Sequence, residues 1–262
     1  MTAALTAELI KVFTTKLWWI LLICVLLLGG GYATLPAITA ILTEPTAAVA
    51  AFEDPATLRA VYNGGNTLSR ILALVIGLMS MGGEYRHRTI VATYLAVPHR
   101  LRAVAAKAVA LTLFGLLYGL VNLLAGVVVA VPFVLVRGGS FFLDQPETWR
   151  SMALGVVSIA LWTMIGFGFG ILIKNMIVAM LVGIGFAYLL EPTLTVLFFA
   201  QQWDLPLNLM PSGATNAMLG ITSPILFASG DPFPWWGGFL VLAGWCLVPA
   251  VLGVLITLRR DV

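Results

Sequence analysis

Long, uninterrupted runs of apolar residues constrain the fold of this chain more than any other feature. The stretch from Leu17 to Leu42, for example, contains no charged residue. A bilayer core is about 30 Å thick and offers backbone polar groups no water, so such a run crosses it as a helix of about 20 residues. Of the 262 residues, 61% are hydrophobic and only 10% are charged, which is more apolar surface than a soluble domain of this length can bury. The sequence therefore predicts an all-α, polytopic membrane protein.

Six segments qualify as spans, and we expect them to form one transmembrane domain over residues 1–262. The predicted spans are 17–42, 66–82, 104–136, 152–173, 176–199 and 236–258. Arg70 lies near the start of the second span, where we expect its side chain to snorkel outward to water. The third span is too long for one bilayer and contains Pro132, which predicts a tilt, a kink or a protruding end. Glu191-Pro192 interrupts the fifth span and predicts a division into two half-helices.

The basic residues predict how the spans are oriented. With a cytosolic N-terminus, ten of the fourteen Lys and Arg residues fall on the cytosolic side and four on the outer side. Because loops that face the cytosol carry an excess of Lys and Arg, we expect both termini in the cytosol and the chain in the plasma (inner) membrane. The basic residues are too few, and lie too close to apolar runs, to predict binding of nucleic acid.

The sequence gives no indication that the chain performs chemistry itself. It has no phosphate-binding loop of the G-x-x-x-x-G-K-[ST] type. His87 and His99 have no Cys or His at metal-ligand spacing. The middle of each span lacks ionisable residues, which argues against proton coupling but leaves sodium sites built from carbonyls open. We therefore predict no catalytic residues, no metal and no cofactor bound by this chain, and a partner that supplies energy.

The loop over residues 83–100 is the most informative polar segment. Two glycines, Gly82 and Gly83, are expected to end the second span and to permit a sharp change of chain direction. Apolar residues then recur at helical spacing from Ile90 to Val97, with charges before them and Pro98 behind. This pattern predicts a short amphipathic helix on the inner membrane surface. From the residues alone, an incidental surface helix in a positively charged loop is as good an interpretation as a docking element.

The string GGEYRHRTIVATYLAVPHRLRAVAAK resembles the first cytosolic loop of type-2 ABC transporter permeases, the membrane subunits of bacterial exporters. The positions that carry the resemblance are Gly82, Glu84, Tyr85, Arg86, Thr89, Leu95, Pro98, Arg100 and Lys107. The segment Glu8–Lys11, followed by Trp18, is similar to the interfacial first helix of that family. The stretch 209–214 is similar to the family's Leu-Pro segment between the last two spans. The Glu191-Pro192 break is similar to its divided fifth helix and its re-entrant outer hairpin.

This resemblance implies a permease that exports an apolar or amphipathic substrate such as a drug, antibiotic or lipid. Cytosolic ABC ATPase subunits would bind ATP and Mg²⁺, and a second permease copy or a homologue would complete the path. The residues implied in coupling to the ATPase are Glu84, Tyr85, Arg86, Arg88, Thr89, Tyr94, Pro98 and Arg100. Candidate substrate-path residues are Glu191, Phe167 and Phe169, although such aromatics also suit helix packing or lipid contact. An ion-coupled secondary transporter and a non-transporting scaffold or sensor remain the alternatives.

Overall fold

A computed structural model describes residues 2–42, 54–87, 89, 100–137, 140–221 and 233–259 of the chain. Within these ranges the elements are helices, and no strand occurs. In chain order they are α1 (Thr2–Thr14), α2 (Leu17–Cys24), the π-helical turn η1 (Val25–Gly29), α3 (Gly30–Leu42), α5 (Pro55–Tyr62), α6 (Asn66–Arg86), α8 (Arg100–Arg137), α9 (Pro146–Leu172), α10 (Met176–Gly185), the π-helical turn η2 (Phe186–Leu190), α11 (Glu191–Ala200), α12 (Asp204–Leu209), α13 (Pro211–Leu219) and α14 (Trp235–Arg259).

Six helical segments in the described part of the chain are long and apolar enough to cross a membrane, which confirms the predicted number of spans. They are Leu17–Leu35, Pro55–Arg86, Leu101–Val136, Pro146–Leu172, Met176–Ala200 and Trp235–Ile256. The fourth begins six residues before its predicted start, because Pro146 occupies the first turn of α9, where the missing N–H is tolerated. Pro132 lies inside α8, which continues through it to Arg137.

The fifth span differs from its prediction. Glu191 and Pro192 do not interrupt it, because α10, η2 and α11 form one continuous helical path from Met176 to Ala200. The irregularity is the π-helical turn Phe186–Leu190, which comes just before the proline. Such a turn rearranges the backbone hydrogen bonds locally, so the helix can accept a residue that lacks an N–H.

The helix α9 forms the centre of the bundle and packs against α6, α8 and α14. Small residues make this close packing possible. A Cβ atom at Gly77 on α6 would lie 2.1 Å from the Thr163 carbonyl oxygen, and one at Gly166 on α9 would lie 2.0 Å from the Leu74 carbonyl oxygen. Only glycine fits at such a crossing. The glycines of the fourth span therefore serve packing within the chain.

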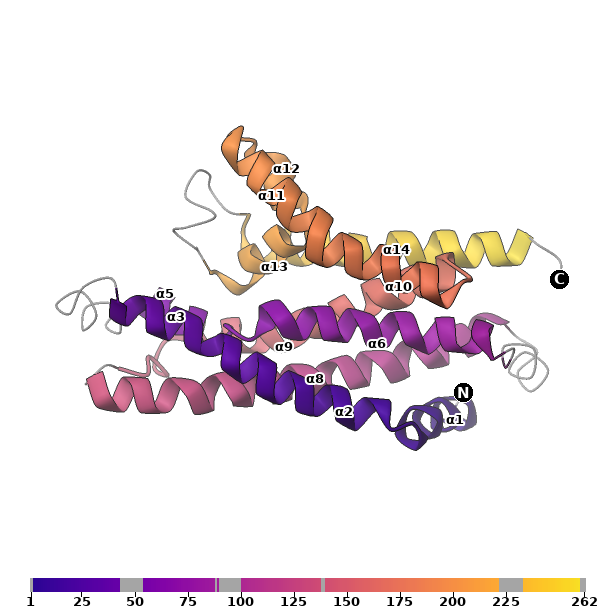
Figure 1. Cartoon of the computed structure of the whole chain (residues 1–262), viewed down its shortest axis with the longest axis horizontal. Helices are drawn as coiled ribbons and strands as arrows, with labels where there is room; N and C mark the ends of the chain where they lie inside the picture. The colour runs from indigo at the N-terminus through magenta and orange to yellow at the C-terminus, as the bar shows by residue number, and fades with distance from the viewer. Residues whose placement is uncertain are drawn as a thin grey trace.

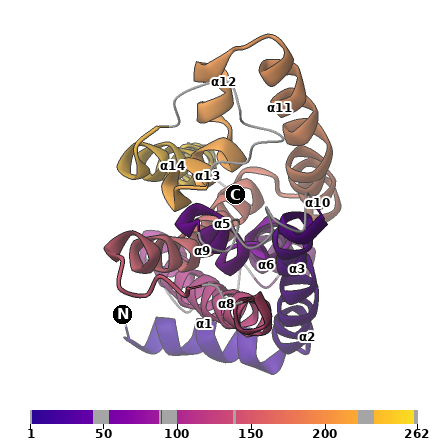
Figure 2. The same cartoon turned by 90° about the vertical axis from the view of Figure 1, so that its left-hand side faces the viewer.

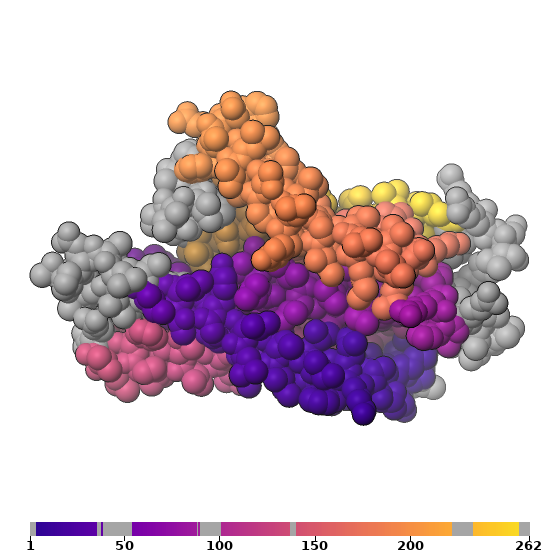
Figure 3. Space-filling model, viewed as in Figure 1, coloured from indigo at the N-terminus to yellow at the C-terminus, as the bar shows by residue number. Residues whose placement is uncertain are grey.

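The long helices lie side by side, and α1 lies across one end of them (Figure 2). The same end of the bundle holds the end of α6, the start of α8 and the end of α14 (Figure 1). At the opposite end, α11 and α12 project from the body as an arm (Figure 3). Large apolar side chains are exposed along this arm, including Val196, Leu197 and Leu205.

Candidate functional site

A cluster of four charged side chains lies at the end of the bundle where α1 crosses it. Lys107 Nζ on α8 is 2.5 Å from Glu8 Oε2 on α1 and 3.0 Å from Glu84 Oε1 on α6. Lys11 Nζ is 2.5 Å from Glu8 Oε1 and 3.0 Å from the same Glu84 oxygen. Two carboxylates and two ammonium groups thus share four ion pairs and balance in charge.

Burial makes this cluster more than a set of surface ion pairs. Glu8, Glu84 and Lys107 are each less than a tenth exposed, whereas the Lys11 side chain is 44% exposed. Isolated buried charges would be costly, but each buried group here has at least one opposite charge within hydrogen-bond distance. The cluster therefore joins α1, the last turn of α6 and the second turn of α8 at one point.

The pairing shifts the pKa of the two groups on α1. Burial by itself raises the pKa of the Glu8 carboxyl, but attraction to Lys107 and hydrogen bonds from Lys107 and Lys11 outweigh it, and the pKa ends below its ordinary value of 4.5. Burial likewise lowers the pKa of the Lys11 ammonium, but hydrogen bonds to Glu8 and Glu84 outweigh it, and the pKa ends above its ordinary value of 10.5. Both groups are therefore charged at neutral pH.

Gly82 and Gly83 do not end the second span, because α6 continues through them to Arg86 and the first predicted coupling residues lie in its last turn. Glu84 points into the cluster, Tyr85 is half-buried against the adjacent apolar core, and Arg86 and Thr89 are exposed. Arg100 begins α8. Arg88, Tyr94 and Pro98 lie outside the described residues, as does the predicted amphipathic helix.

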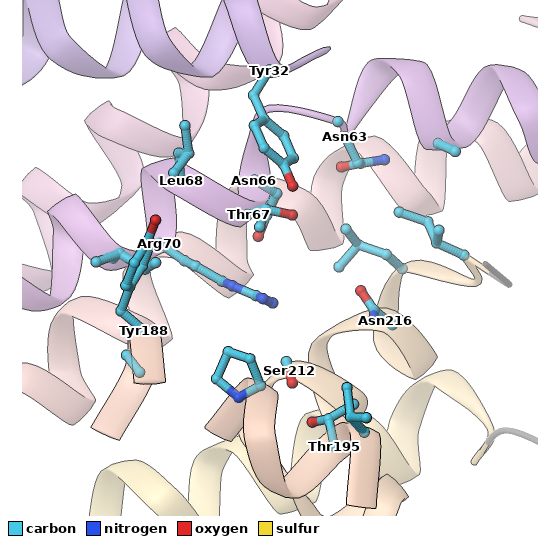
Figure 4. Close-up of a pocket in the computed structure, with 18 residues that line it drawn as sticks. Tyr32, Asn63, Asn66, Thr67, Leu68, Arg70, Tyr188, Thr195, Ser212 and Asn216 are labelled. Carbon is cyan, nitrogen blue, oxygen red and sulfur yellow. The ribbon is translucent and has the colours of Figure 1, made fainter. Parts of the chain in front are cut away.

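A second polar feature is a cavity of about 630 Å³ that lies between α6 on one side and η2, α11 and α13 on the other. Figure 4 shows Tyr32, Asn66, Arg70, Thr195, Ser212 and Asn216 around it. These residues come from α3, α6, α11 and α13, which are far apart in the sequence. The cavity therefore depends on the tertiary fold.

Arg70 does not snorkel outward as the sequence predicts. Its guanidinium lies over the Trp162 ring, 5.1 Å from the centroid, and its side chain lines the cavity. The physical reason is that Pro55–Arg86 forms a longer span than expected, so Arg70 lies inside that span and away from its end. A cation over an aromatic face in a desolvated site is stabilised by the ring quadrupole.

Glu191, one of the predicted substrate-path residues, lies next to this cavity but does not line it. The structure buries Glu191 to 1% exposure, where Oε1 accepts a hydrogen bond from the Ser212 backbone N–H at 2.5 Å. Ser212 lies in the first turn of α13, whose N-terminal N–H groups favour a negative charge. Glu191 and Arg70 also attract each other electrostatically.

The two aromatic residues predicted on the substrate path, Phe167 and Phe169, lie outside this cavity. Phe167 is buried in the apolar core with Phe114 and Ile171. Phe169 packs against Phe186, with ring centroids 6.3 Å apart. Of the described residues, neither of these two lines the cavity.

Hydrogen bonds hold the helices around the cavity in register. Asn63 Nδ2 donates to Ser151 Oγ at 3.1 Å, and Ser69 Oγ donates to Asn122 Oδ1 at 2.8 Å. Trp162 Nε1 donates to Thr215 Oγ1 at 3.0 Å, which ties α9 to α13. These bonds fix the walls of the site, because side chains on α6, α8, α9 and α13 take part in them.

Comparison with known proteins adds no family assignment, since no family model and no curated protein matches the sequence. Within the described residues, no group of three or more His, Cys, Asp or Glu side chains is placed to hold a metal ion. The structure therefore offers two candidate features. At one end of the bundle, four ion pairs join α1, α6 and α8 beside the loop. In the other half, a polar cavity has the Arg70 guanidinium on its wall.

Proposed function

We propose that this chain is the membrane-spanning permease subunit of an ATP-binding-cassette exporter in the plasma (inner) membrane. A separate cytosolic subunit would hydrolyse ATP with Mg²⁺, and this chain would move an apolar or amphipathic substrate outward. A second permease copy or a homologue would complete the path. The apolar arm of α11 and α12 suits contact with such a copy or with lipid.

The observation that carries this proposal is the charged cluster of Glu8, Lys11, Glu84 and Lys107. It fixes the last turn of α6 and the second turn of α8, the two helices between which the loop runs, to the crossing helix α1. A partner that pulls on the loop would therefore displace these elements together. A rigid junction of this kind is what a lever needs in order to transmit motion into the spans.

The position of Glu84 refines the roles that the resemblance implies. Its carboxylate is engaged by two lysines, so we assign Glu84 to holding the base of the loop. Arg86 is exposed at the same end and is the better candidate for direct contact with the ATPase. The loop residues Arg88, Thr89, Tyr94, Pro98 and Arg100 keep their proposed place in this docking element.

An ion-coupled secondary transporter is the second candidate, and one observation favours it. Arg70 lies inside the second span and Glu191 inside the fifth. The sequence had argued against proton coupling because the middles of the predicted spans contain no ionisable residue. Ionisable residues inside spans are typical of ion and proton pathways. The two candidates differ in their source of energy, so one purification separates them.

The experiment is purification of the tagged chain from its native membrane in mild detergent, followed by an assay of ATP hydrolysis on the co-purified material. The exporter proposal predicts a stoichiometric ATPase. A preparation that contains no ATPase, with or without nucleotide, would support the ion-coupled carrier instead. Transport driven by an ion gradient in reconstituted vesicles would then be the positive test of that alternative.

A further inference from the structure

Two side chains on the wall of the cavity have polar atoms that no described residue satisfies. Asn66 is 4% exposed and Thr195 is 7% exposed, yet Asn66 Oδ1 and Thr195 Oγ1 have no hydrogen-bond partner. The Asn66 amide nitrogen donates to Ser158 Oγ at 2.8 Å and to the Gly155 carbonyl at 3.2 Å, which leaves Oδ1 as an acceptor. Buried polar atoms are normally paired, so two unpaired atoms on residues that line one cavity point to a missing ligand. Both atoms have almost no accessible surface, so a ligand reaches them only when the two side chains turn toward the cavity.

Arg70 gives the same cavity a positive charge. Among the described residues it forms no ion pair, and the nearby Glu191 carboxylate is turned toward the Ser212 N–H. Glu191 itself does not line the cavity. The planar guanidinium therefore offers N–H donors to an occupant, and this fork geometry matches a phosphate or a carboxylate.

Apolar residues also line the cavity and could contact the hydrocarbon part of a ligand. Leu68, Ile71 and Val196 line the cavity beside the polar residues. Its volume of about 630 Å³ lies within the range of about 300–1,000 Å³ that is usual for ligand pockets. The site thus combines one cation, two unsatisfied polar groups and an apolar wall.

We propose that this cavity binds an amphipathic anion. Arg70 holds its phosphate or carboxylate. Once their side chains turn toward the ligand, Asn66 accepts a hydrogen bond from a hydroxyl or N–H group, and the Thr195 hydroxyl donates one to a neighbouring oxygen. Arg70 and Thr195 come from opposite walls (Figure 4), so the ligand bridges the second and fifth spans. The inference that an amphipathic anion is the transported substrate rests on the proposed exporter function. Binding of the anion to the cavity requires no ATPase and is tested without one.

The test uses the full chain in phosphatidylcholine nanodiscs, with empty nanodiscs to subtract partitioning. Two probes with the same fluorophore on the same dodecyl chain are titrated, one with a phosphate headgroup and one with a trimethylammonium headgroup. The phosphate probe should bind saturably at one site, and the ammonium probe should not. Arg70→Gln should weaken binding about tenfold or more, as the loss of a charge-assisted hydrogen bond implies.

Matched variants separate this site from general attraction of anions. Arg150→Gln removes an exposed arginine that lines a different cavity and should leave binding unchanged. Thr195→Val keeps the side-chain shape and should weaken binding about twofold to tenfold through its lost hydrogen bond. Arg70→Lys keeps the charge and should retain part of the affinity, which covers the case in which Arg70→Gln fails to fold.

Equal binding of the two probes would overturn the proposal, and so would full affinity in Thr195→Val together with a folded Arg70→Gln. An equal loss in Arg150→Gln would also overturn it. Adding phosphatidylglycerol to the nanodiscs identifies the source of the anion. Displacement of the probe means that the ligand is a bilayer lipid, and lack of displacement means that it is a free amphiphile; either result supports an anionic site.

Discussion

Lys107 on α8 contacts Glu8 on α1 at 2.5 Å, although 99 positions separate them in the chain. The contact is buried on both sides, since each side chain is less than a tenth exposed. It brings the N-terminal helix to the start of the third span, beside the end of the second. This relationship defines the junction on which the proposed mechanism depends.

Removing one charge from the buried part of the cluster should destabilise the protein far more than removing the exposed one. Lys107→Met leaves Glu8 and Glu84 short of a buried counter-charge, which costs about 3–5 kcal/mol. Lys11→Met removes a side chain that is 44% exposed, and an exposed pair contributes about 0–1 kcal/mol. Unfolding in mixed micelles with increasing denaturing detergent measures both variants against the wild type. Similar losses for the two lysines would contradict the buried assignment of Lys107.

The stability that Glu8 contributes should depend on pH in a defined direction. Its pKa in the folded protein lies below the ordinary value of 4.5, so the folded state favours the charged form. The contribution is therefore fully present above about pH 4.5 and is lost as the pH falls through the lowered pKa of the folded state. The unfolding free energy of wild type and Glu8→Gln, compared from neutral pH downward, should converge in acid. A constant difference across that range would show that Glu8 acts through packing alone.

Lys11 should show the opposite dependence at alkaline pH. Its folded-state pKa lies above the ordinary value of 10.5, so its contribution is complete below about pH 10.5 and declines as the pH rises through the raised value. The difference in stability between wild type and Lys11→Met should shrink only in that alkaline range. If it already disappears near neutral pH, the pairing of Lys11 with Glu8 and Glu84 is wrong.

The crossing of α6 and α9 should not accept even one added methyl group. Gly77→Ala would place a Cβ atom 2.1 Å from the Thr163 carbonyl oxygen, so the helices must separate at a cost of about 1–3 kcal/mol. Gly244→Ala on α14 is the matched control, because nothing lies within 4 Å of its Cβ position. This control should be neutral or stabilised by up to about 1 kcal/mol. Thermal unfolding in detergent tests the pair, and equal effects would contradict this close approach.

The overall architecture could be predicted from the sequence, because a segment that crosses lipid must be long, apolar and helical. Runs of apolar residues mark spans regardless of tertiary contacts, and all six were located, with the fifth running from Met176 to Ala200. The break expected at Glu191-Pro192 was wrong, since proline rules describe regular α-helix and the chain instead uses a π-helical turn. Local sequence patterns do not show such an adjustment.

The candidate sites depended on contacts that the sequence does not display. The sequence places Glu8 in a predicted interfacial helix and Lys107 near the start of the third span, and nothing in either segment indicates that the two residues pair. The sequence predicted Arg70 near the end of a short second span. In the structure the span also includes the helix Pro55–Tyr62, so Arg70 lies well inside it. The sequence did contain one usable signal for these contacts, because polar residues in or beside spans face other helices more often than lipid. The residues that carry this signal are Asn63, Asn66 and Ser151.

The central claim is that the bundle end bearing the cluster docks an ATPase, and charge reversal tests it most directly. Arg86 is exposed there, and Arg150 is exposed in the first turns of α9 at the opposite end. The measurement is the amount of ATPase that co-purifies with wild type, Arg86→Glu and Arg150→Glu at equal expression and insertion. We predict that Arg86→Glu loses the ATPase while Arg150→Glu retains it. Full retention by Arg86→Glu, or equal loss in both variants, would contradict the docking role of this end.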